Sequence, residues 1–239
     1  MKEFIGLLIH KIGFKPKQTG NTYYKETAKK YLQRRQGSAK WEKEQGVVKE
    51  FLKYFADGSR VLDIPFGTGR FVDLYLDKKM SIYGLDISKD MVDVAREVLG
   101  EKFSHCSVII ADATKPLPYE DDYFDAVVSW KFIKFFRYDI AKKILIEIRR
   151  VLKDKLIINV AIRNPDAEIV DDPDNLKAIG GNIYEDDLMR LFNESGFNLL
   201  EKRLIVDGSK ISNIDEENTS RIICAYLLEK SYTIGDTIN

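Results

Sequence analysis

Three aspartates stand where a parallel sheet would bring them together. Asp63 is the next-to-last residue of the run RVLDI, Asp86 ends SIYGLD and Asp112 ends SVIIAD. Ligands of open parallel sheets lie beyond the carboxyl ends of the strands, so we expect the three carboxylates to share one site. A turn of small residues follows the first aspartate in VLDIPFGTGRF: Pro65, Gly67, Thr68 and Gly69.

This spacing predicts a ligand built on adenosine. Glycines let the backbone pass close to a ligand where a Cβ would clash, and a helix starting behind them offers free N–H groups to an anionic group. Asp86 is placed to accept hydrogen bonds from both ribose hydroxyls, and Asp112 to meet the adenine amino group. A nicotinamide dinucleotide fits less well, because Val72 stands where that fingerprint needs a third small residue. A P-loop is excluded, since no Gly-Lys-Ser/Thr follows.

Strand-like and helix-like segments alternate regularly around these residues. The expected strands cover 60–64, 81–86, 107–112, 124–130, 156–162, 197–206 and 221–230. The expected helices cover 23–36, 39–56, 69–79, 88–99, 138–152 and 184–195. This alternation predicts an α/β fold with helices on both faces of a parallel sheet, finished by an antiparallel hairpin at one edge.

The motifs resemble those of the class I S-adenosylmethionine-dependent methyltransferases, in the branch that acts on small molecules. VLDIPFGTGRF matches the first motif of that family, GLDISKDMVDVA the second, and IIADATKPLPYEDDYFDAVVSW the third and fourth. The resemblance implies a Rossmann-like seven-stranded mixed sheet of order 3-2-1-4-5-7-6, with strand 7 antiparallel and an N-terminal helical extension. It also implies S-adenosyl-L-methionine as the cofactor and S-adenosyl-L-homocysteine as the product.

The same resemblance assigns cofactor contacts to individual residues. Asp63 and Gly67–Gly69 would lie along the methionine part, and Asp86 would hold the ribose. Trp130 would line the methionine side. The remaining contacts, at the adenine and along the glycine turn, would come from Pro65, Ile87, Met91, Asp112 and Ala113.

A second group of contacts is expected from an N-terminal helix. Tyr31 and Arg35 are four residues apart and would share one helix face. In relatives with a similar Tyr-x-x-Arg-Arg run this helix closes over the cofactor, and Arg35 or Arg34 would pair with its carboxylate bidentately. The alternative is that both side chains lie on the surface. Loop 163–182 is expected either to shape the acceptor pocket or to be plain solvated chain.

No catalytic base and no metal site is assigned. His10 lies in the N-terminal arm and His105 opens the third strand, at the end opposite the site, so we expect structural roles for both. Small-molecule relatives often carry a histidine just after the fourth strand, where this chain has Lys131-Phe132-Ile133-Lys134. No acid or histidine cluster stands near the site apart from the cofactor aspartates. The Asn/Asp-Pro-Pro-Tyr/Phe run of nucleic-acid amino methylators is replaced by Ser129-Trp130-Lys131-Phe132.

Composition sets the remaining expectations. The 239 residues, 44% hydrophobic, suit one α/β domain with an appendage. We divide the chain into an N-terminal arm and helical lid (1–56), a cofactor-binding domain (57–230) and a polar tail (231–239). The formal net charge is zero, which gives no support for a nucleic-acid partner. Residues 1–50 are basic, which suits an acidic surface or substrate, or simply a solvated helical face.

Partners and location follow from the arm and the cysteines. Two widely separated cysteines, Cys106 and Cys224, indicate no disulfide framework, and a reducing cytoplasmic location is expected. The apolar run 4–9 is too short to span a bilayer. Residues 1–17 could contact a membrane surface, or pack on their own domain or a second subunit, so the chain is expected to be a monomer or a homodimer. The expected function is methyl transfer to a small-molecule, sugar or lipid-linked acceptor. The alternatives are an RNA or protein methyltransferase and a non-catalytic cofactor-binding module.

Overall fold

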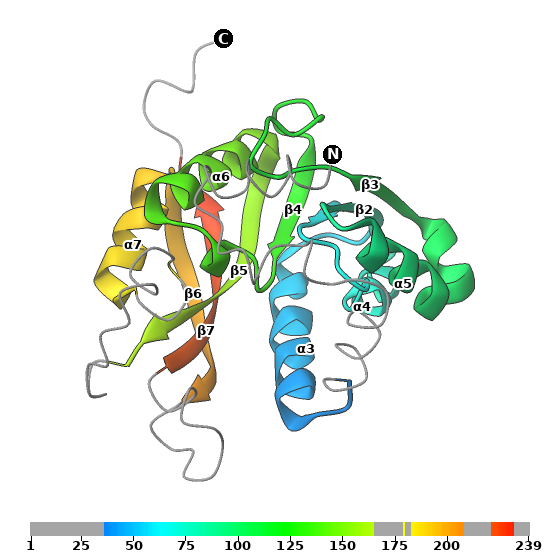
Figure 1. The fold of residues 1–239 in the computed structure, drawn as a ribbon, viewed down its shortest axis with the longest axis horizontal. Coiled ribbons are helices and arrows are strands. Elements are labelled where there is room, and N and C mark those ends of the chain that lie inside the picture. Colours follow the sequence, from blue (N-terminus) through cyan, green and yellow to red (C-terminus); the bar gives the residue numbers. More distant parts are fainter. Residues whose placement is uncertain (1–35, 165–178, 180–182, 208–220, 232–239) are drawn as a thin grey trace, which may run out of the picture.

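A seven-stranded mixed sheet forms the centre of the molecule (Figure 1). The computed structural model describes residues 36–164, 179, 183–207 and 221–231. The strands are β1 (Arg60–Asp63), β2 (Ser81–Asp86), β3 (Cys106–Ile110), β4 (Phe124–Ser129), β5 (Leu152–Arg163), β6 (Phe197–Asp207) and β7 (Arg221–Lys230). Their order is β3-β2-β1-β4-β5-β7-β6. The first five run parallel, and β7 is antiparallel to both β5 and β6. The predicted strand order and orientation are confirmed.

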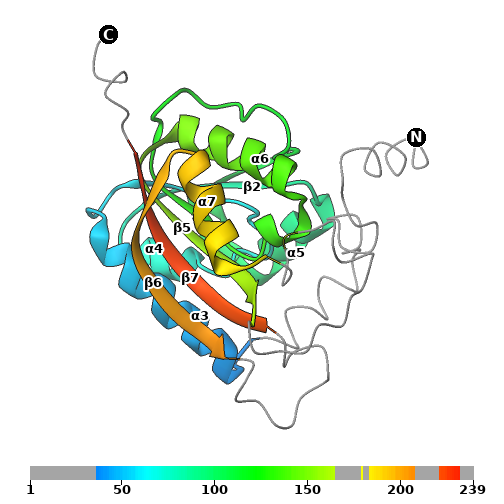
Figure 2. The same cartoon turned by 90° about the vertical axis from the view of Figure 1, so that its left-hand side faces the viewer.

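Helices cover both faces of this sheet (Figures 1 and 2). They are α3 (Ala39–Phe51), α4 (Val72–Asp77), α5 (Lys89–Leu99), α6 (Tyr138–Val151) and α7 (Glu185–Glu194). Strand residues alternate between two cores: Val127 belongs to the core with α6 and α7, whereas Ala126 and Val128 belong to the core with α3, α4 and α5. Within the described residues, no helix is long and apolar enough to cross a membrane.

Several element boundaries differ from those expected. Helix α3 ends at Phe51 and not at residue 56, because the chain continues there as a short 3-10 turn. Helix α4 begins at Val72 rather than at Gly69, because Gly69 has a φ of 70° and belongs to the turn. Strand β3 ends at Ile110, so Asp112 lies in the loop beyond it. Strand β5 starts at Leu152, which pairs with Phe124, so residues 153–155 lie in the strand and not in the expected turn. Most of the expected helix 23–36, the arm before it and most of loop 163–182 fall outside the described residues.

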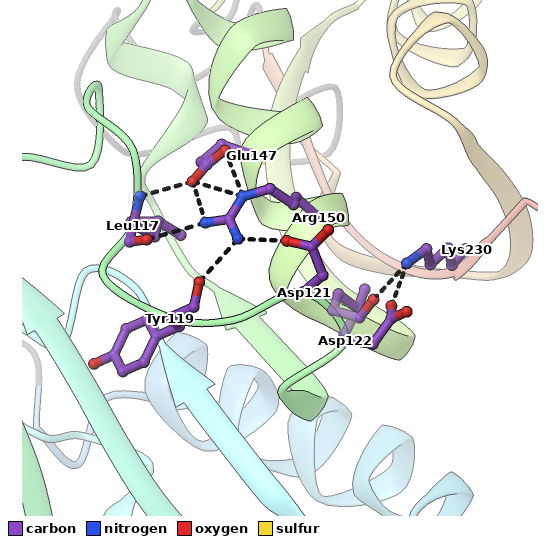
Figure 3. Close-up of polar contacts among 8 residues, drawn as sticks. Leu117, Tyr119, Asp121, Asp122, Glu147, Arg150 and Lys230 are labelled. Carbon is purple, nitrogen blue, oxygen red and sulfur yellow. Dashed lines mark hydrogen bonds and ion pairs between the residues drawn. The ribbon is translucent and has the colours of Figure 1, made fainter. Parts of the chain in front are cut away.

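The connection between β3 and β4 contains no helix and is held by Arg150 (Figure 3). The guanidinium donates to the carbonyl oxygens of Leu117 and Tyr119 and pairs with Asp121 at 2.7 Å. It also donates to Glu147, whose carboxylate accepts the Leu117 N–H at 2.7 Å. The end of α6 therefore fixes the loop that carries Asp112 back to the sheet.

Candidate functional site

One pocket lies at the carboxyl ends of β1, β2 and β4. It gathers residues from five separate segments of the chain, beginning with α3 and ending with the turn after β4. The sequence-predicted residues that line it are Asp63, Pro65, Gly67, Thr68, Asp86, Ile87, Met91, Asp112, Ala113 and Trp130. Gly69 does not line it, and Tyr31, Arg34 and Arg35 lie outside the described residues. The folding pattern therefore brings together three carboxylates that are far apart in sequence.

Asp86 ties the glycine turn to the end of β2. Its Oδ2 accepts the Gly67 N–H at 2.8 Å, and its Oδ1 accepts the Ser88 N–H at 2.8 Å. The side chain is almost fully buried, and this burial raises its pKa although the backbone N–H groups oppose the shift. Each carboxylate oxygen still has a second lone pair, so Asp86 can accept hydrogen bonds from hydroxyl groups in the pocket as well.

Asp63 is the most deeply buried acid of the site, with 2% of its surface exposed. Burial holds the pKa of its carboxyl well above the ordinary value, while Tyr75 and Arg70 nearby act in the opposite direction and Asp86 adds to the rise. In the part of the chain that the structure describes, Asp63 Oδ2 and the Tyr75 hydroxyl have no hydrogen-bond partner of normal geometry. A buried acceptor at the wall of a pocket suits a ligand that brings a donor.

The two glycines of the turn do different work. A Cβ on Gly67 would meet only the Met91 side chain, at 3.6 Å, so this glycine leaves the pocket open beside it. A Cβ on Gly69 would lie 2.6 Å from Leu99 Cδ1. Gly69 is therefore needed for close packing against α5 and for its left-handed φ of 70°, and it does not line the pocket.

Gly84, which the sequence patterns did not indicate as a site residue, leaves room in β2 for the ring of Phe66 in the glycine turn. A Cβ at this position in β2 would lie 2.4 Å from the ring of Phe66, the residue before Gly67. Phe66 is itself buried, and its N–H donates to the Leu85 carbonyl at 2.9 Å. A glycine inside a strand, where a side chain would normally pack, is the sequence signal for such a close approach.

The part of the pocket beyond Asp86 is lined mainly by apolar side chains, with one carboxylate, that of Asp112. Ile87 exposes 38% of its surface into an otherwise well-covered region, next to the buried Met91 and Ala113. Asp112 caps the following turn through Oδ1, which accepts from the N–H and the hydroxyl of Thr114. An exposed isoleucine beside a fixed carboxylate suits a planar ring that carries an exocyclic amino group.

Aromatic and basic side chains, most of them not predicted as site residues, form the wall near β4. Trp130 is 5% exposed, its indole N–H has no partner among the described residues, and its ring meets Phe71 edge to face at 5.4 Å. The wall residues that sequence reasoning missed are Trp41, Arg70, Phe71, Lys131, Phe132, Lys134, Phe135 and Phe136. Trp41 joins them because it lies in the first turn of α3, and this end of the helix lines the pocket.

The two histidines and two cysteines play no part in this site among the residues described. His105 ends a 3-10 turn before β3, at the amino end of the strand, as expected, while His10 lies outside the described ranges. Both cysteines are free thiols, and burial raises the pKa of Cys106 to about 11. The structure therefore offers no thiolate or imidazole at the pocket within the described chain.

Comparison with known proteins gives this geometry its context. Residues 61–155 match a family model described as a methyltransferase domain. No curated protein matches the chain. The chain resembles the phosphoethanolamine N-methyltransferase 2 of Haemonchus contortus, whose structure is a complex with phosphomonomethylethanolamine and S-adenosylhomocysteine. The identity is 16% and the TM-score 0.62, and the match covers 80% of this chain and 53% of that one.

Two archaeal structures match this chain over more of their own length. A SAM-dependent methyltransferase from Methanosarcina mazei is 17% identical with a TM-score of 0.58, covering 76% of this chain and 96% of that one. A complex of the Haloferax volcanii Trm112 activator with a methyltransferase is 19% identical with a TM-score of 0.62, covering 86% and 94%. At these identities the likeness shows the fold. The matched family model shows that residues 61–155 carry a methyltransferase domain, within a fold that these structures share.

Proposed function

We propose that this chain transfers a methyl group from S-adenosylmethionine to a small-molecule acceptor held against the wall near β4. The observation that carries the proposal is the extent of the pocket. It continues past the three aspartates to an apolar surface built by α3 and the turn after β4. The residues of this acceptor wall are Trp41, Trp130, Phe132 and Phe135. Pockets for small molecules combine such a surface with a few fixed polar groups.

The polar groups of the pocket fit the implied cofactor. Asp63 Oδ2 is a buried acceptor and the Trp130 indole N–H a buried donor, and neither has a partner among the described residues. A ligand ammonium would donate to Asp63 Oδ2, and a ligand oxygen would accept from the Trp130 N–H. Asp86 would hold the ribose hydroxyls through its free lone pairs. Ile87 and Asp112 would meet the flat face and the amino edge of adenine.

In this reaction the chain would position the acceptor against the cofactor and exclude water from the site. When bound, the cofactor supplies a methyl group on a sulfonium that is already activated for displacement. The acceptor wall would hold the acceptor in line and dry, and correct orientation alone supplies roughly 7–11 kcal/mol in well-built sites. A general base is needed only where the acceptor must lose a proton early.

A small acceptor is supported by the few residues that make up the wall and by one structural relative. The wall consists of a few side chains enclosed between α3 and the turn after β4, which suits one ring or a short chain. The Haemonchus contortus relative is in complex with phosphomonomethylethanolamine, which is a small molecule. A sugar or a lipid headgroup that presents one small reactive end fits the same wall.

Calorimetric titration with S-adenosylhomocysteine tests the cofactor site. The Asp86→Ala variant is expected to lose binding by about 10-fold or more, because it removes the ribose acceptor and releases the Gly67 N–H. Asp93→Ala is the matched control, since Asp93 is an exposed aspartate on α5 that pairs with Lys89. Failure of the folded wild-type protein to bind would contradict the proposal.

Transfer of labelled methyl groups to fractionated metabolites tests the acceptor. Once an acceptor is found, Phe135→Ala is expected to raise its KM while the affinity for S-adenosylhomocysteine changes less than about 2-fold. Binding of S-adenosylhomocysteine without transfer to any acceptor would favour a non-catalytic binding module. Transfer only to RNA or to protein would overturn the small-molecule assignment.

A further inference from the structure

A buried guanidinium lies at the corner where α3 meets the glycine turn. Arg70 directly follows Gly69, lines the pocket and keeps only 12% of its side chain exposed. Its Nη1 donates to Glu44 Oε2 at 2.8 Å, and its plane lies over the ring of Trp41 at 3.9 Å. Lys131 Nζ contacts the same Glu44 oxygen at 2.8 Å. The guanidinium is therefore held at its Nη1 edge by the ion pair with Glu44 and at its face by the ring of Trp41.

The other edge of this guanidinium has no hydrogen-bond partner within the described ranges. Arg70 Nε and Nη2 are both buried and both lack a partner. These two N–H groups lie on the same side of the planar guanidinium, opposite the Nη1 that Glu44 holds. They form the edge that binds a carboxylate through two parallel hydrogen bonds. Since unmet buried donors cost free energy, this edge points to a ligand with a planar, anionic, bidentate group.

A second buried group identifies which ligand carries that anion. Asp63 Oδ2 lies in the same pocket and has no hydrogen-bond partner of normal geometry among the described residues. It is also close enough for Arg70 to influence its pKa. A fixed cationic edge next to a buried acceptor matches the carboxylate and the ammonium of an α-amino acid. Among the ligands of the proposed function, the methionine end of the cofactor has this chemistry.

We propose that the Nε–Nη2 edge of Arg70 binds the carboxylate of the cofactor's amino-acid end, with Glu44 as the residue that positions the guanidinium. The inference rests on the proposed function and names the partner that the sequence had assigned to Arg35 or Arg34. It also gives α3 a role in binding, because the helix supplies both the ion pair and the ring that orient Arg70.

The test compares two ligands that differ in the amino-acid end. S-adenosylhomocysteine carries the carboxylate, and 5′-methylthioadenosine lacks the whole end but keeps the nucleoside. Calorimetry on Arg70→Lys is expected to show S-adenosylhomocysteine weakened about 10- to 100-fold, with 5′-methylthioadenosine within about 2-fold of wild type. Lysine keeps the charge opposite Glu44 but cannot form the two-pronged contact. Arg96→Lys, at an exposed arginine on α5, is the matched control.

A second variant keeps the test decisive if Arg70→Lys does not fold. Glu44→Gln leaves the arginine in place and removes the charge that holds it, and it is expected to give a smaller loss with the same ligand selectivity. Equal weakening of both ligands would overturn the inference, because it would mean a structural role. The inference would also be overturned if Arg35→Gln, and not Arg70→Lys, selectively lost affinity for S-adenosylhomocysteine. The same holds if Arg70→Lys altered only the KM of the methyl acceptor. Failure of the wild type to bind either ligand would instead count against the proposed function.

Discussion

Replacing Asp63 by asparagine should make the protein more stable while it disables the cofactor site. The carboxyl is buried to 2% exposure, and its Oδ2 and the nearby Tyr75 hydroxyl have no partners among the described residues. Asparagine has the same shape and no charge to desolvate, and its amide could donate to the Tyr75 oxygen. The substitution therefore removes the cost of burying an acid and gives two polar groups a contact with each other.

The sign of the pH dependence follows from the direction of the pKa shift. Burial raises the pKa of Asp63 in the folded protein well above its ordinary value. Its contribution to stability is thus complete below the unfolded pKa and is lost as the pH rises through the folded pKa. The advantage of Asp63→Asn should grow with pH. An unsatisfied buried polar group costs about 1–3 kcal/mol, which corresponds to a rise in Tm of about 2–12 °C for a chain of this size.

Thermal unfolding followed by circular dichroism at pH 4, 6 and 8 would measure this effect. The Tm of Asp63→Asn should exceed that of the wild type at pH 8 and approach it at pH 4, while calorimetry shows weakened S-adenosylhomocysteine binding. Asp93→Asn is a control of opposite sign, because the hydrogen bond from Lys89 lowers the pKa of that exposed carboxyl. A lower Tm for Asp63→Asn at pH 8, or a difference that does not vary with pH, would refute the reasoning.

Two further predictions concern the supports of the site. Gly84→Ala should cost about 1–3 kcal/mol in urea unfolding, because its Cβ would lie 2.4 Å from the Phe66 ring. A smaller loss in the Phe66→Leu background would identify that clash, and full additivity would exclude it. Glu147→Gln should destabilise by about 1–3 kcal/mol at pH 7. Burial acts to raise the pKa of Glu147, but Arg150 and the Leu117 N–H hold it below its ordinary value. The stabilisation is present above the ordinary glutamate pKa and lost as the pH falls, so equal losses at pH 7 and pH 3 would contradict this account.

Much of the fold and the acidic half of the site can be predicted from local sequence patterns. Strand β2 and helix α5 match their expected limits closely, because apolar alternation marks the strand and Ser88 caps the helix by accepting the Met91 N–H. The positions of Asp63 and Asp86 follow from the rule that parallel strands end on one side of a sheet. Such rules depend on residues that are neighbours in the chain, which is why they work from sequence.

The basic and aromatic half of the site could not be predicted in this way. Glu44 and Arg70 are 26 residues apart and meet only because α3 packs over the turn. Neither residue belongs to a periodic pattern that would indicate burial of a charge. The start of β5 differs from the expected one for a related reason, since Lys155 is polar but pairs with Ala126 of β4 near the beginning of the strand.

The edge strand β6 affects how readily two copies of the protein associate at high concentration. It exposes three leucines, Leu199, Leu200 and Leu204, in a strand whose outer edge pairs with no other described strand, which is an arrangement prone to aggregation. Its register against β7 is interrupted twice, near Leu199 and near Leu204. A second copy seeking a regular ladder along this edge would lose alignment within a few residues. Glu201 and Arg203, paired with each other at the centre of the strand, would also have to give up water. The irregular register and the charged pair thus protect this edge against aggregation. A variant in which β6 is regular is expected to be less soluble while it still folds.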